Sequence, residues 1–403
     1  MERDPQKGLE GSEAGPWRTV VMPSLFLMVA MFNLTLIVAG LKELMIDDLG
    51  GTTRDTSLFF SIEMAAYILF APLCGVMSDR LGRRRPFVFV GFLASGLLYL
   101  SYLHVETVST MLAVRFVQGA FSVMGWSILM AMVLDQPDEK KRGRYMGIMG
   151  ACLIFGVSMG APFGGVISRE MGIRAPLQVV GWLFILLAAG TFLLPRTASV
   201  RRQEGMREVL RTLSRHPRLL FPYAFQFADR YTVGFFVILF PQYLATLGVE
   251  DPAVRGQYLA FFLLPFAFLQ YFTGRLAERI GAYLPLLVGS LAYGVVLCFV
   301  GFSDLFALWW VMAVLGVLAS VMFPPAILLT AQLSDPETRG SAMGGFNLAG
   351  SLGFAVGPLV GVWVYEQAGF GAAFIVSGGL EILLALVAGL WVWRRRATLS
   401  GVG

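Results

Sequence analysis

The sequence predicts an all-α membrane protein whose twelve transmembrane helices form two pseudo-symmetric six-helix bundles. Its composition is the first reason: 57% of the 403 residues are hydrophobic, 14% are charged, and the mean hydropathy is +0.71. A soluble globular chain of this length is less apolar. The second reason is a set of twelve apolar stretches, and the third is a motif that occurs once in each half of the chain. A duplicated membrane bundle accounts for all three.

Each apolar stretch is long enough to cross a bilayer as a helix. Roughly 20 residues are needed, because in hydrocarbon the backbone polar groups must be satisfied within their own helix. The predicted spans are residues 19–41, 56–77, 87–103, 108–134, 144–167, 175–195, 218–247, 256–274, 283–302, 305–332, 340–364 and 371–393.

The longest polar interruption, residues 196–217, lies at the centre of the chain. We therefore predict six-helix bundles over residues 19–195 and 218–393, joined by a cytoplasmic linker over 196–217. Residues 1–18 and 394–403 are expected to be cytoplasmic tails. The first of them lacks a short apolar core that ends in a cleavage site, so we do not expect a secretory signal there.

The cations fall mainly on one side of the predicted membrane. When the N-terminus is placed inside, most of the 31 Lys and Arg residues lie on that side, as is typical of cytoplasmic loops. We therefore expect both termini in the cytoplasm of a multi-pass protein of the cell (inner or plasma) membrane. The net charge of +5 is then a topology signal. The expected partners are the lipid bilayer, protons and a small molecule, with no nucleic acid, and we expect a monomer.

Several classes of chemistry lack their sequence signals. Cys74, Cys152 and Cys298 fall inside predicted spans, so we expect no disulfides. His104 and His216 are far apart, so no metal site is predicted. The sequence has no phosphate-binding Gly-x-x-x-x-Gly-Lys-Ser/Thr motif, which argues against an ATP-driven pump. The spans also lack an evident nucleophile–base set, so we expect neither an enzyme nor a cofactor.

A charged loop between the second and third spans is the most specific motif. Its marked residues are Gly75, Asp79, Arg80, Gly82 and Arg83. Gly82 allows a tight turn, and the arginines hold the loop on the cytoplasmic side. A carboxylate at a helix end can also accept hydrogen bonds from the N-terminus of a neighbouring helix. A weaker copy with Glu278 and Arg279 follows the eighth span.

Small residues recur at four-residue spacing in the fifth and eleventh spans. They are Gly156, Gly160, Pro162 and Gly164 in the fifth and Gly353, Gly357, Pro358 and Gly361 in the eleventh. This spacing lets helix backbones approach closely where lipid offers no hydrophobic driving force. We predict that both sets are helix-packing faces related by the internal repeat.

The loop of residues 75–86 resembles the loop between the second and third helices of the major facilitator superfamily, whose pattern is roughly Gly-x-x-x-Asp-Arg-x-Gly-Arg-Arg. The resemblance implies that family's fold and a latch on the inner side of the membrane. In this latch Asp79 would meet the start of the eleventh helix near Gly340, and Arg83 would pair with Asp135 at the end of the fourth. A topology signal alone is the other interpretation of the loop.

Two further motifs are similar to motifs of the same family. Arg115 and Gln118 lie in an Arg-x-x-Gln-Gly pattern in the fourth span. The glycines around Pro162 resemble the fifth-helix motif associated with exporters, although the proline comes one place late. The second resemblance favours export over import. Packing and kinking by Gly and Pro explain the same residues without any statement about direction.

Two opposite charges lie at matching depth in the second and fourth spans. Glu63 and Arg115 each lie seven residues into a helix that starts on the outer side, so both are about 10 Å deep at roughly 1.5 Å per residue. A charge inside a span is costly and faces a partner or a cavity. We predict that the two side chains pair, either statically or as part of the coupling machinery. Gln118 and Trp126 continue the same polar face.

The seventh span contains Gln226, Asp229 and Arg230 near the middle of the membrane. Adjacent helical residues point about 100° apart, so we expect only one of Asp229 and Arg230 to face a central cavity. A carboxyl group there can bind or release a proton as its access to water and substrate changes. A structural Asp–Arg network is an equal alternative. Glu381 in the last span is a further embedded acid, to which the sequence assigns no role.

Residues of the first and fourth spans predict an adaptable apolar pocket with few polar contacts. Met31, Asn33 and Trp126 are among its expected lining residues. We therefore predict a secondary active transporter that exports a lipophilic or amphipathic small molecule in exchange for protons, by alternating access and with the proton gradient as its energy source. One alternative is a proton-linked or passive importer of a small organic solute. Another is a lipid-handling or sensory membrane protein of the same fold.

Overall fold

The computed structural model describes residues 17–134, 142–195, 206–335 and 338–400, and its regular elements are helices. The long helices are α1 (Met22–Leu36), α2 (Thr53–Leu81), α3 (Arg85–Ser101), α4 (Val108–Leu134), α5 (Arg142–Met171), α6 (Ala175–Gly190), α8 (Leu220–Thr246), α9 (Pro252–Ile280), α10 (Tyr283–Phe299), α11 (Leu305–Gln332) and α12 (Arg339–Ser400). The shorter ones are η2 (Trp17–Val21), η3 (Val38–Gly40), η4 (Glu43–Asp48), η5 (Tyr102–His104), η6 (Thr191–Leu193), α7 (Met206–Arg215), η7 (Pro217–Leu219) and η8 (Val300–Phe302).

Ten helical segments of the described chain are long and apolar enough to cross a membrane. Helix α12 is one of these ten, although it contains both of the last two predicted spans. Its helical backbone is broken at Gly369, where φ is 81° and ψ is 176°. Helix α8 covers the seventh predicted span but is not among the ten. Its polar residues Gln226, Asp229 and Arg230 lower its hydropathy. All twelve predicted spans therefore fall on helices.

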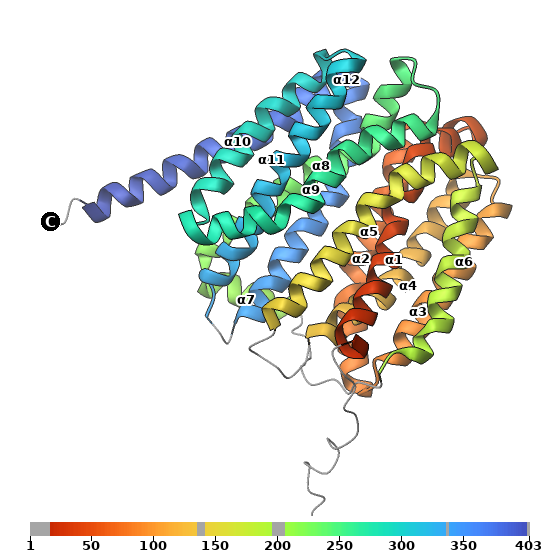
Figure 1. Ribbon diagram of the computed structural model, residues 1–403, viewed down its shortest axis with the longest axis horizontal. Helices are drawn as coiled ribbons and strands as arrows, with labels where there is room; N and C mark the ends of the chain where they lie inside the picture. The colour runs from red at the N-terminus through yellow and green to blue at the C-terminus, as the bar shows by residue number, and fades with distance from the viewer. Residues whose placement is uncertain (1–16, 135–141, 196–205, 336–337, 401–403) are drawn as a thin grey trace, which may run out of the picture.

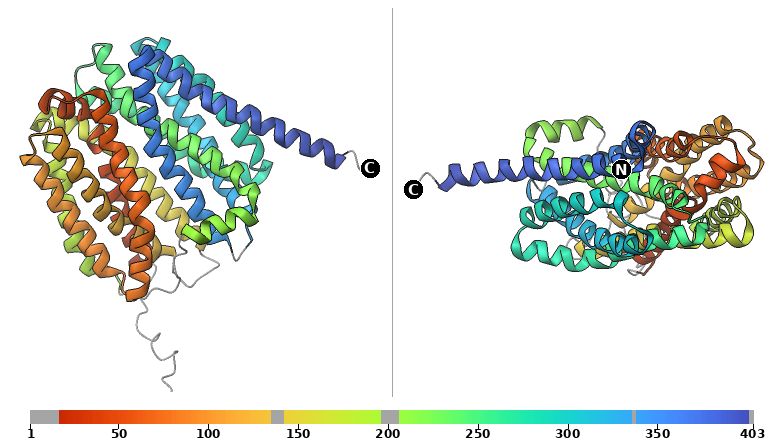
Figure 2. Two further views of the ribbon diagram at one scale, coloured as in Figure 1. Left: turned by 180° about the vertical axis from the view of Figure 1, so that it is seen from behind. Right: turned by 90° about the horizontal axis from the view of Figure 1, so that it is seen from above.

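The helices form two groups (Figure 1). Helices α1–α6 lie together and make the N-terminal half, and α7–α12 lie together and make the C-terminal half. The halves meet chiefly where α5 runs along α9 and α2 along α12, and we call this contact surface the seam. The view from behind shows the same division (Figure 2). The predicted boundaries at the tails and the linker stay predictions, because residues 1–16, 196–205 and 401–403 are outside the described chain.

Local sequence sets the ends of the long helices. Thr52 and Asp55 form a reciprocal capping box at the start of α2, which satisfies backbone N–H groups that have no partner in the helix. The same helix ends at Gly82, whose φ of 62° is left-handed. Gly281 ends α9 with a φ of 86°. Only glycine adopts such a φ at little cost, so the two copies of the charged loop use the same stop signal.

Glycines set the distance between neighbouring helices within each half. A Cβ atom at Gly156, Gly160 or Gly164 of α5 would overlap a backbone carbonyl oxygen of α1. On α12, a Cβ atom at Gly353 or Gly357 would overlap a carbonyl oxygen of α8, and one at Gly361 would overlap the ring of Phe235. Pro162 and Pro358 lie inside the same two helices. The repeated small-residue sequence thus lies at corresponding helix contacts in the two halves.

Gly164→Ala should destabilise the protein, because its new methyl group meets the Leu36 carbonyl oxygen and forces α5 away from α1. We expect a cost of about 1–3 kcal/mol, seen as a lower melting temperature of the purified protein in detergent. Gly150→Ala is the matched control on the same helix, since a Cβ atom there meets no heavy atom of the described residues within 4 Å. Equal melting temperatures for the two variants would contradict this account of the packing.

Candidate functional site

Arg115 and Glu63 form a buried ion pair between α4 and α2. Arg115 Nη2 lies 2.5 Å from Glu63 Oε2, and the side chains are 2% and 0% exposed. The two helices come close at Gly119, where a Cβ atom would lie 3.0 Å from the Cβ of Ala66. The two charges that the sequence places at equal depth are therefore neighbours in the structure.

Three polar side chains from α1, α3 and α4 surround the guanidinium group. Arg115 Nη1 donates hydrogen bonds to the Tyr99 hydroxyl oxygen at 2.7 Å and to Gln118 Oε1 at 3.0 Å. The Tyr99 hydroxyl in turn donates to Asn33 Oδ1. The guanidinium carbon also lies 4.3 Å from the centre of the Phe59 ring, a cation–π contact. Arg115 is therefore compensated on several sides.

The carboxylate of Glu63 has its own second partner. Tyr67, one turn later on α2, donates to Glu63 Oε1 at 2.9 Å, and its ring packs edge-on against Trp126 with ring centres 5.4 Å apart. We call Asn33, Glu63, Tyr67, Tyr99, Arg115 and Gln118 the N-terminal network. Sequence reasoning missed the two tyrosines. Tyr67 could have been found, because it lies four residues after Glu63 and thus on the same face.

Asp229 and Arg230 of α8 face in different directions. Arg230 Nε lies 3.6 Å from Asp229 Oδ2, but the guanidinium group extends away over the rings of Phe323 and Phe354, whose centres are 4.4 and 5.5 Å from its central carbon. Phe354 packs across the seam against Phe60 of α2, with ring centres 6.0 Å apart. Arg230 is thus the member of the pair that lies beside the seam.

Asp229 lies on the other side of α8, within electrostatic range of Tyr293 in α10 and Glu381 in α12. Ser290 donates to Glu381 Oε2 at 2.5 Å, and Thr232 Oγ1 lies 3.4 Å from Glu381 Oε1. We call Asp229, Thr232, Ser290, Tyr293 and Glu381 the C-terminal acid cluster. Gln226, one turn before Asp229 and Arg230, packs against Gly350 of α12.

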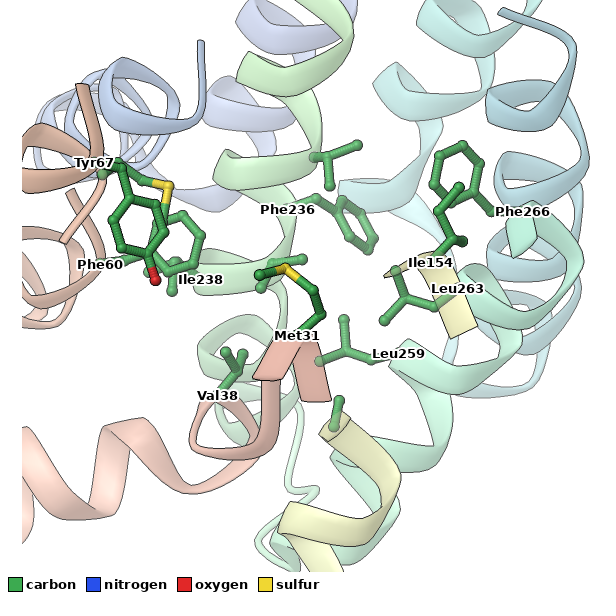
Figure 3. Close-up of a cluster of buried hydrophobic side chains, with 14 of the residues drawn as sticks. Met31, Val38, Phe60, Tyr67, Ile154, Phe236, Ile238, Leu259, Leu263 and Phe266 are labelled. Atoms are coloured by element: carbon green, nitrogen blue, oxygen red, sulfur yellow. The ribbon is translucent and has the colours of Figure 1, made fainter. Parts of the chain in front are cut away.

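Apolar side chains fill the middle of the seam (Figure 3). Met31 of α1 lies among residues of both halves, and Ile154 of α5 lies near Leu263 and Phe266 of α9. Other members of this cluster are Val38, Phe60, Tyr67, Phe236, Ile238 and Leu259. Of the predicted lining residues, Met31 and Asn33 are buried and Trp126 is half-buried. The interior between the halves is accordingly aromatic and aliphatic, with the ionised groups at its border.

Polar contacts also join the two halves near the loops that carry few cations, which we call the outer end. Glu43 of η4 pairs with Arg255 of α9, whose side chain is fully buried. The other contacts are Arg169 Nη1 to Asp251 Oδ2 at 3.3 Å and Gln242 Nε2 to Thr56 Oγ1 at 2.8 Å. We name these three pairs the outer gate. Sequence reasoning missed it, because its partners lie far apart in the chain and share no motif.

The charged loop at the inner end contains an ion pair of its own. Arg84, at 1% exposure, is buried beside Asp79, and its Nη2 lies 3.2 Å from Asp79 Oδ1. Arg83 is exposed, and its predicted partner Asp135 lies outside the described residues, so that pairing stays a prediction. Gly75 is buried. The exposed members of the two loop copies are Arg80, Gly82, Glu278 and Arg279, and Gly340 is exposed as well.

Both halves of the chain match one family, the Major Facilitator Superfamily, over residues 24–260 and 226–402. The chain is 26% identical to the chromaffin granule amine transporter of Rattus norvegicus over 337 residues, which cover 81% of this chain and 64% of that protein. It is 26% identical to the synaptic vesicular amine transporter of Homo sapiens over 353 residues, 84% of this chain and 66% of that protein. The chain thus spans just under two thirds of the length of these amine transporters.

A bacterial relative matches over nearly its whole length. The tetracycline resistance protein, class E, of Escherichia coli is 23% identical over 391 residues, 92% of this chain and 94% of that protein. Solved structures share the fold. A bacterial homologue of the human lysosomal transporter Spinster, inward-facing and occupied, gives a TM-score of 0.77 at 14% identity over 94% of this chain and 97% of that one. The nucleoside transporter NupG gives 0.74 at 13% identity over 91% and 96%.

These comparisons confirm the predicted fold class and the predicted resemblance to the major facilitator superfamily. The two matched ranges together cover both halves of the chain. The chain belongs to the major facilitator superfamily.

Proposed function

We propose that the protein exports lipophilic or amphipathic small molecules in exchange for protons, by alternating access. The observation that carries this proposal is the Asp229–Arg230 ion pair inside one span. The arginine is the member of the pair that lies beside the apolar seam. Ionised groups within the membrane are costly and are kept where they serve an ion or substrate pathway. An embedded acid next to such a pathway is suited to carry a proton.

The two buried pairs support different roles. The Glu63–Arg115 contact is short and enclosed by Tyr67, Tyr99 and Gln118, so opening it would leave charges without partners. The Asp229–Arg230 contact is longer, at 3.6 Å, and Asp229 Oδ2 makes no hydrogen bond within the described chain. We therefore assign proton coupling to Asp229 and Arg230 and a mainly positioning role to the N-terminal network.

The substrate class follows from the seam and from the relatives. Aliphatic and aromatic side chains of both halves meet there, and such surfaces bind apolar bodies while a few polar groups orient them. Proteins similar to this chain are named for amine transport and for tetracycline resistance. Both names describe compounds with an apolar body and an ionisable group, which supports an amphipathic substrate.

Inside-out vesicles that contain the protein test both the direction and the coupling. Ethidium is a suitable probe, because a permanent cation is not trapped by an acidic lumen as a weak base would be. With the membrane potential clamped, one-for-one exchange predicts up to about ten-fold accumulation for each unit by which the lumen is more acidic. Tetracycline serves as a second probe, and vesicles without protein give the background.

Depletion of probe from the acidic lumen would favour the importer, and reconstitution with labelled phospholipid tests the lipid-handling alternative.

Asp229→Asn should abolish the accumulation driven by the pH gradient, from about ten-fold per pH unit to about one-fold, because asparagine cannot exchange a proton. Downhill movement of ethidium should persist. Asp304→Asn is the matched control: Asp304 caps α11 through the Ala307 N–H at 2.7 Å, and asparagine caps a helix equally well. Unchanged gradient-driven accumulation in Asp229→Asn would remove Asp229 from the coupling mechanism.

Alternating access requires that the outer gate open in another conformer. The Glu43–Arg255 pair buries a guanidinium group between the halves, so it favours the conformer in which the outer ends are together. For the gate to open and close, the free energy of the contacts that hold it shut must amount to only a few kcal/mol. Removing one of its charges should therefore shift the population toward an open outer end and leave the two halves folded.

Arg255→Gln should lengthen the distance between spin labels on Glu106→Cys and Thr246→Cys, two exposed positions at the outer ends of the two halves. The labels go into a variant without the three native cysteines, and double electron–electron resonance gives the distances. Lys42→Gln is the matched control, because the Lys42–Asp47 pair of 2.9 Å lies within the N-terminal half. A distance distribution that Arg255→Gln leaves unchanged would contradict the gate.

A further inference from the structure

Glu381 is fully buried in the second part of α12, after the break at Gly369, and faces α8 and α10. Its side chain is 0% exposed, as is that of Glu63 in the N-terminal half. The two buried glutamates have different surroundings, however. Glu63 has a guanidinium group at 2.5 Å, whereas the contacts of the Glu381 carboxyl group in the described chain are the hydroxyl groups of Ser290 and Thr232.

The helices packed around Glu381 provide one cation for two acids. Helices α10 and α11, residues 283–299 and 305–332, contain no Asp, Glu, Lys, Arg or His. The charged residues of α8 are Asp229 and Arg230, which pair with each other. The other titratable group that faces the cluster is the phenol of Tyr293. A second carboxylate would leave the cluster with an uncompensated buried charge, which is strongly unfavourable.

The hydrogen bonds indicate which oxygen of Glu381 carries the proton. Ser290 donates to Oε2 at 2.5 Å. Thr232 Oγ1 has a single hydrogen, and its short contacts are to the backbone carbonyl oxygens of Asp229 and Ala228 at 2.9 and 3.1 Å. That hydrogen reaches Glu381 Oε1 only over 3.4 Å, so Oε1, unlike Oε2, has no short hydrogen bond from a donor. A hydrogen on Oε1 satisfies this arrangement.

A phenol hydroxyl group lies beside the same cluster. The Tyr293 side chain is 1% exposed, and its hydroxyl oxygen makes no hydrogen bond to the described residues. It nevertheless lies within electrostatic range of Thr232, Asp229 and Glu381. Asp229 Oδ2 likewise makes no hydrogen bond. A buried hydroxyl group without a hydrogen-bond partner is uncommon, and that of Tyr293 lies beside the acid cluster.

We propose that Glu381 is a proton-binding group of the C-terminal half: in this conformer its carboxyl group is neutral, with the proton on Oε1, while Asp229 is ionised and paired with Arg230. Release breaks the O–H bond on Oε1, leaves the electron pair on the carboxylate, and passes the proton to a water molecule. The C-terminal half then holds two carboxylates against one guanidinium group, which favours a different arrangement of α8, α10 and α12. That Glu381 takes part in transport rests on the proposed function, whereas its protonation does not.

Infrared spectroscopy of the purified protein tests the protonation directly. At neutral pH the parent should show a carboxylic-acid C=O band that is lost in Glu381→Gln. Glu63→Gln is the matched control, because Glu63 is equally buried but ionised beside Arg115 and should contribute no acid band. Ser290→Ala should move the Glu381 band without removing it, since it deletes the hydrogen bond to Oε2. This shift assigns the band to Glu381 independently of Glu381→Gln.

An acid band that Glu381→Gln leaves intact, or that Ser290→Ala does not move, would overturn the proposal. Glutamine can reproduce both hydrogen bonds of the protonated acid, so Glu381→Gln should keep the parent's melting temperature. A large loss of stability would indicate that the parent needs an ionised Glu381, and would also overturn it.

A second measurement tests whether this proton is linked to the conformer. With spin labels at Glu106→Cys and Thr246→Cys, raising the pH should shift the parent toward longer outer distances, and Glu381→Gln should remain in the short-distance population at every pH. Equal pH responses in parent and variant, or no response in the parent, would overturn the link. Neither measurement uses a substrate or a gradient. Failure of the proposed export would therefore appear only in the vesicle experiment, and can be distinguished from failure of the Glu381 proposal.

Discussion

Charged side chains inside the low-dielectric interior of a membrane must be compensated, and the rest of this structure depends on that constraint. An ionised side chain within a span is tolerated only with a partner, a cavity or a proton. The N-terminal half meets this constraint with a counter-charge, since Arg115 and Glu63 are paired at 2.5 Å and surrounded by tyrosine and amide groups. The C-terminal half meets it less completely, because Asp229 pairs with Arg230 while the neighbouring Glu381 has hydroxyl groups as its contacts in the described chain. Only the second arrangement leaves a charge balance that one proton can change.

The helix packing keeps these groups where they are. Glycines of α5 against α1 and of α12 against α8 bring backbones into contact within each half, so each half can move as a rigid body. The seam between the halves is different in kind. It is apolar at its middle (Figure 3) and joined at its outer end by ion pairs and hydrogen bonds. Rigid halves and a seam held by a few polar contacts are the physical requirements for a rocking transporter.

The sequence predicted the features that depend on spacing along one helix. The twelve spans, the paired depth of Glu63 and Arg115 and the glycine faces follow from helical rise and period, and the structure places these residues accordingly. Features that depend on how distant helices meet were not predictable. The sequence could not say which of Asp229 and Arg230 faces the seam, that Arg84 and not Arg83 is buried beside Asp79, or that residues of α8 and α10 surround Glu381. The outer gate joins Glu43 to Arg255 across 212 residues, and neither residue belongs to a motif.

The central claim is that substrate movement in one direction is compensated by a proton moving in the other. Its most direct test measures proton and ethidium movement in the same vesicles. The purified protein is placed in proteoliposomes that contain a pH-sensitive dye, and no pH gradient is imposed. An inward ethidium gradient should then drive protons out of the lumen, so that the lumen becomes more alkaline in proportion to the ethidium that enters. Protein-dependent entry of ethidium at constant lumen pH would contradict the account.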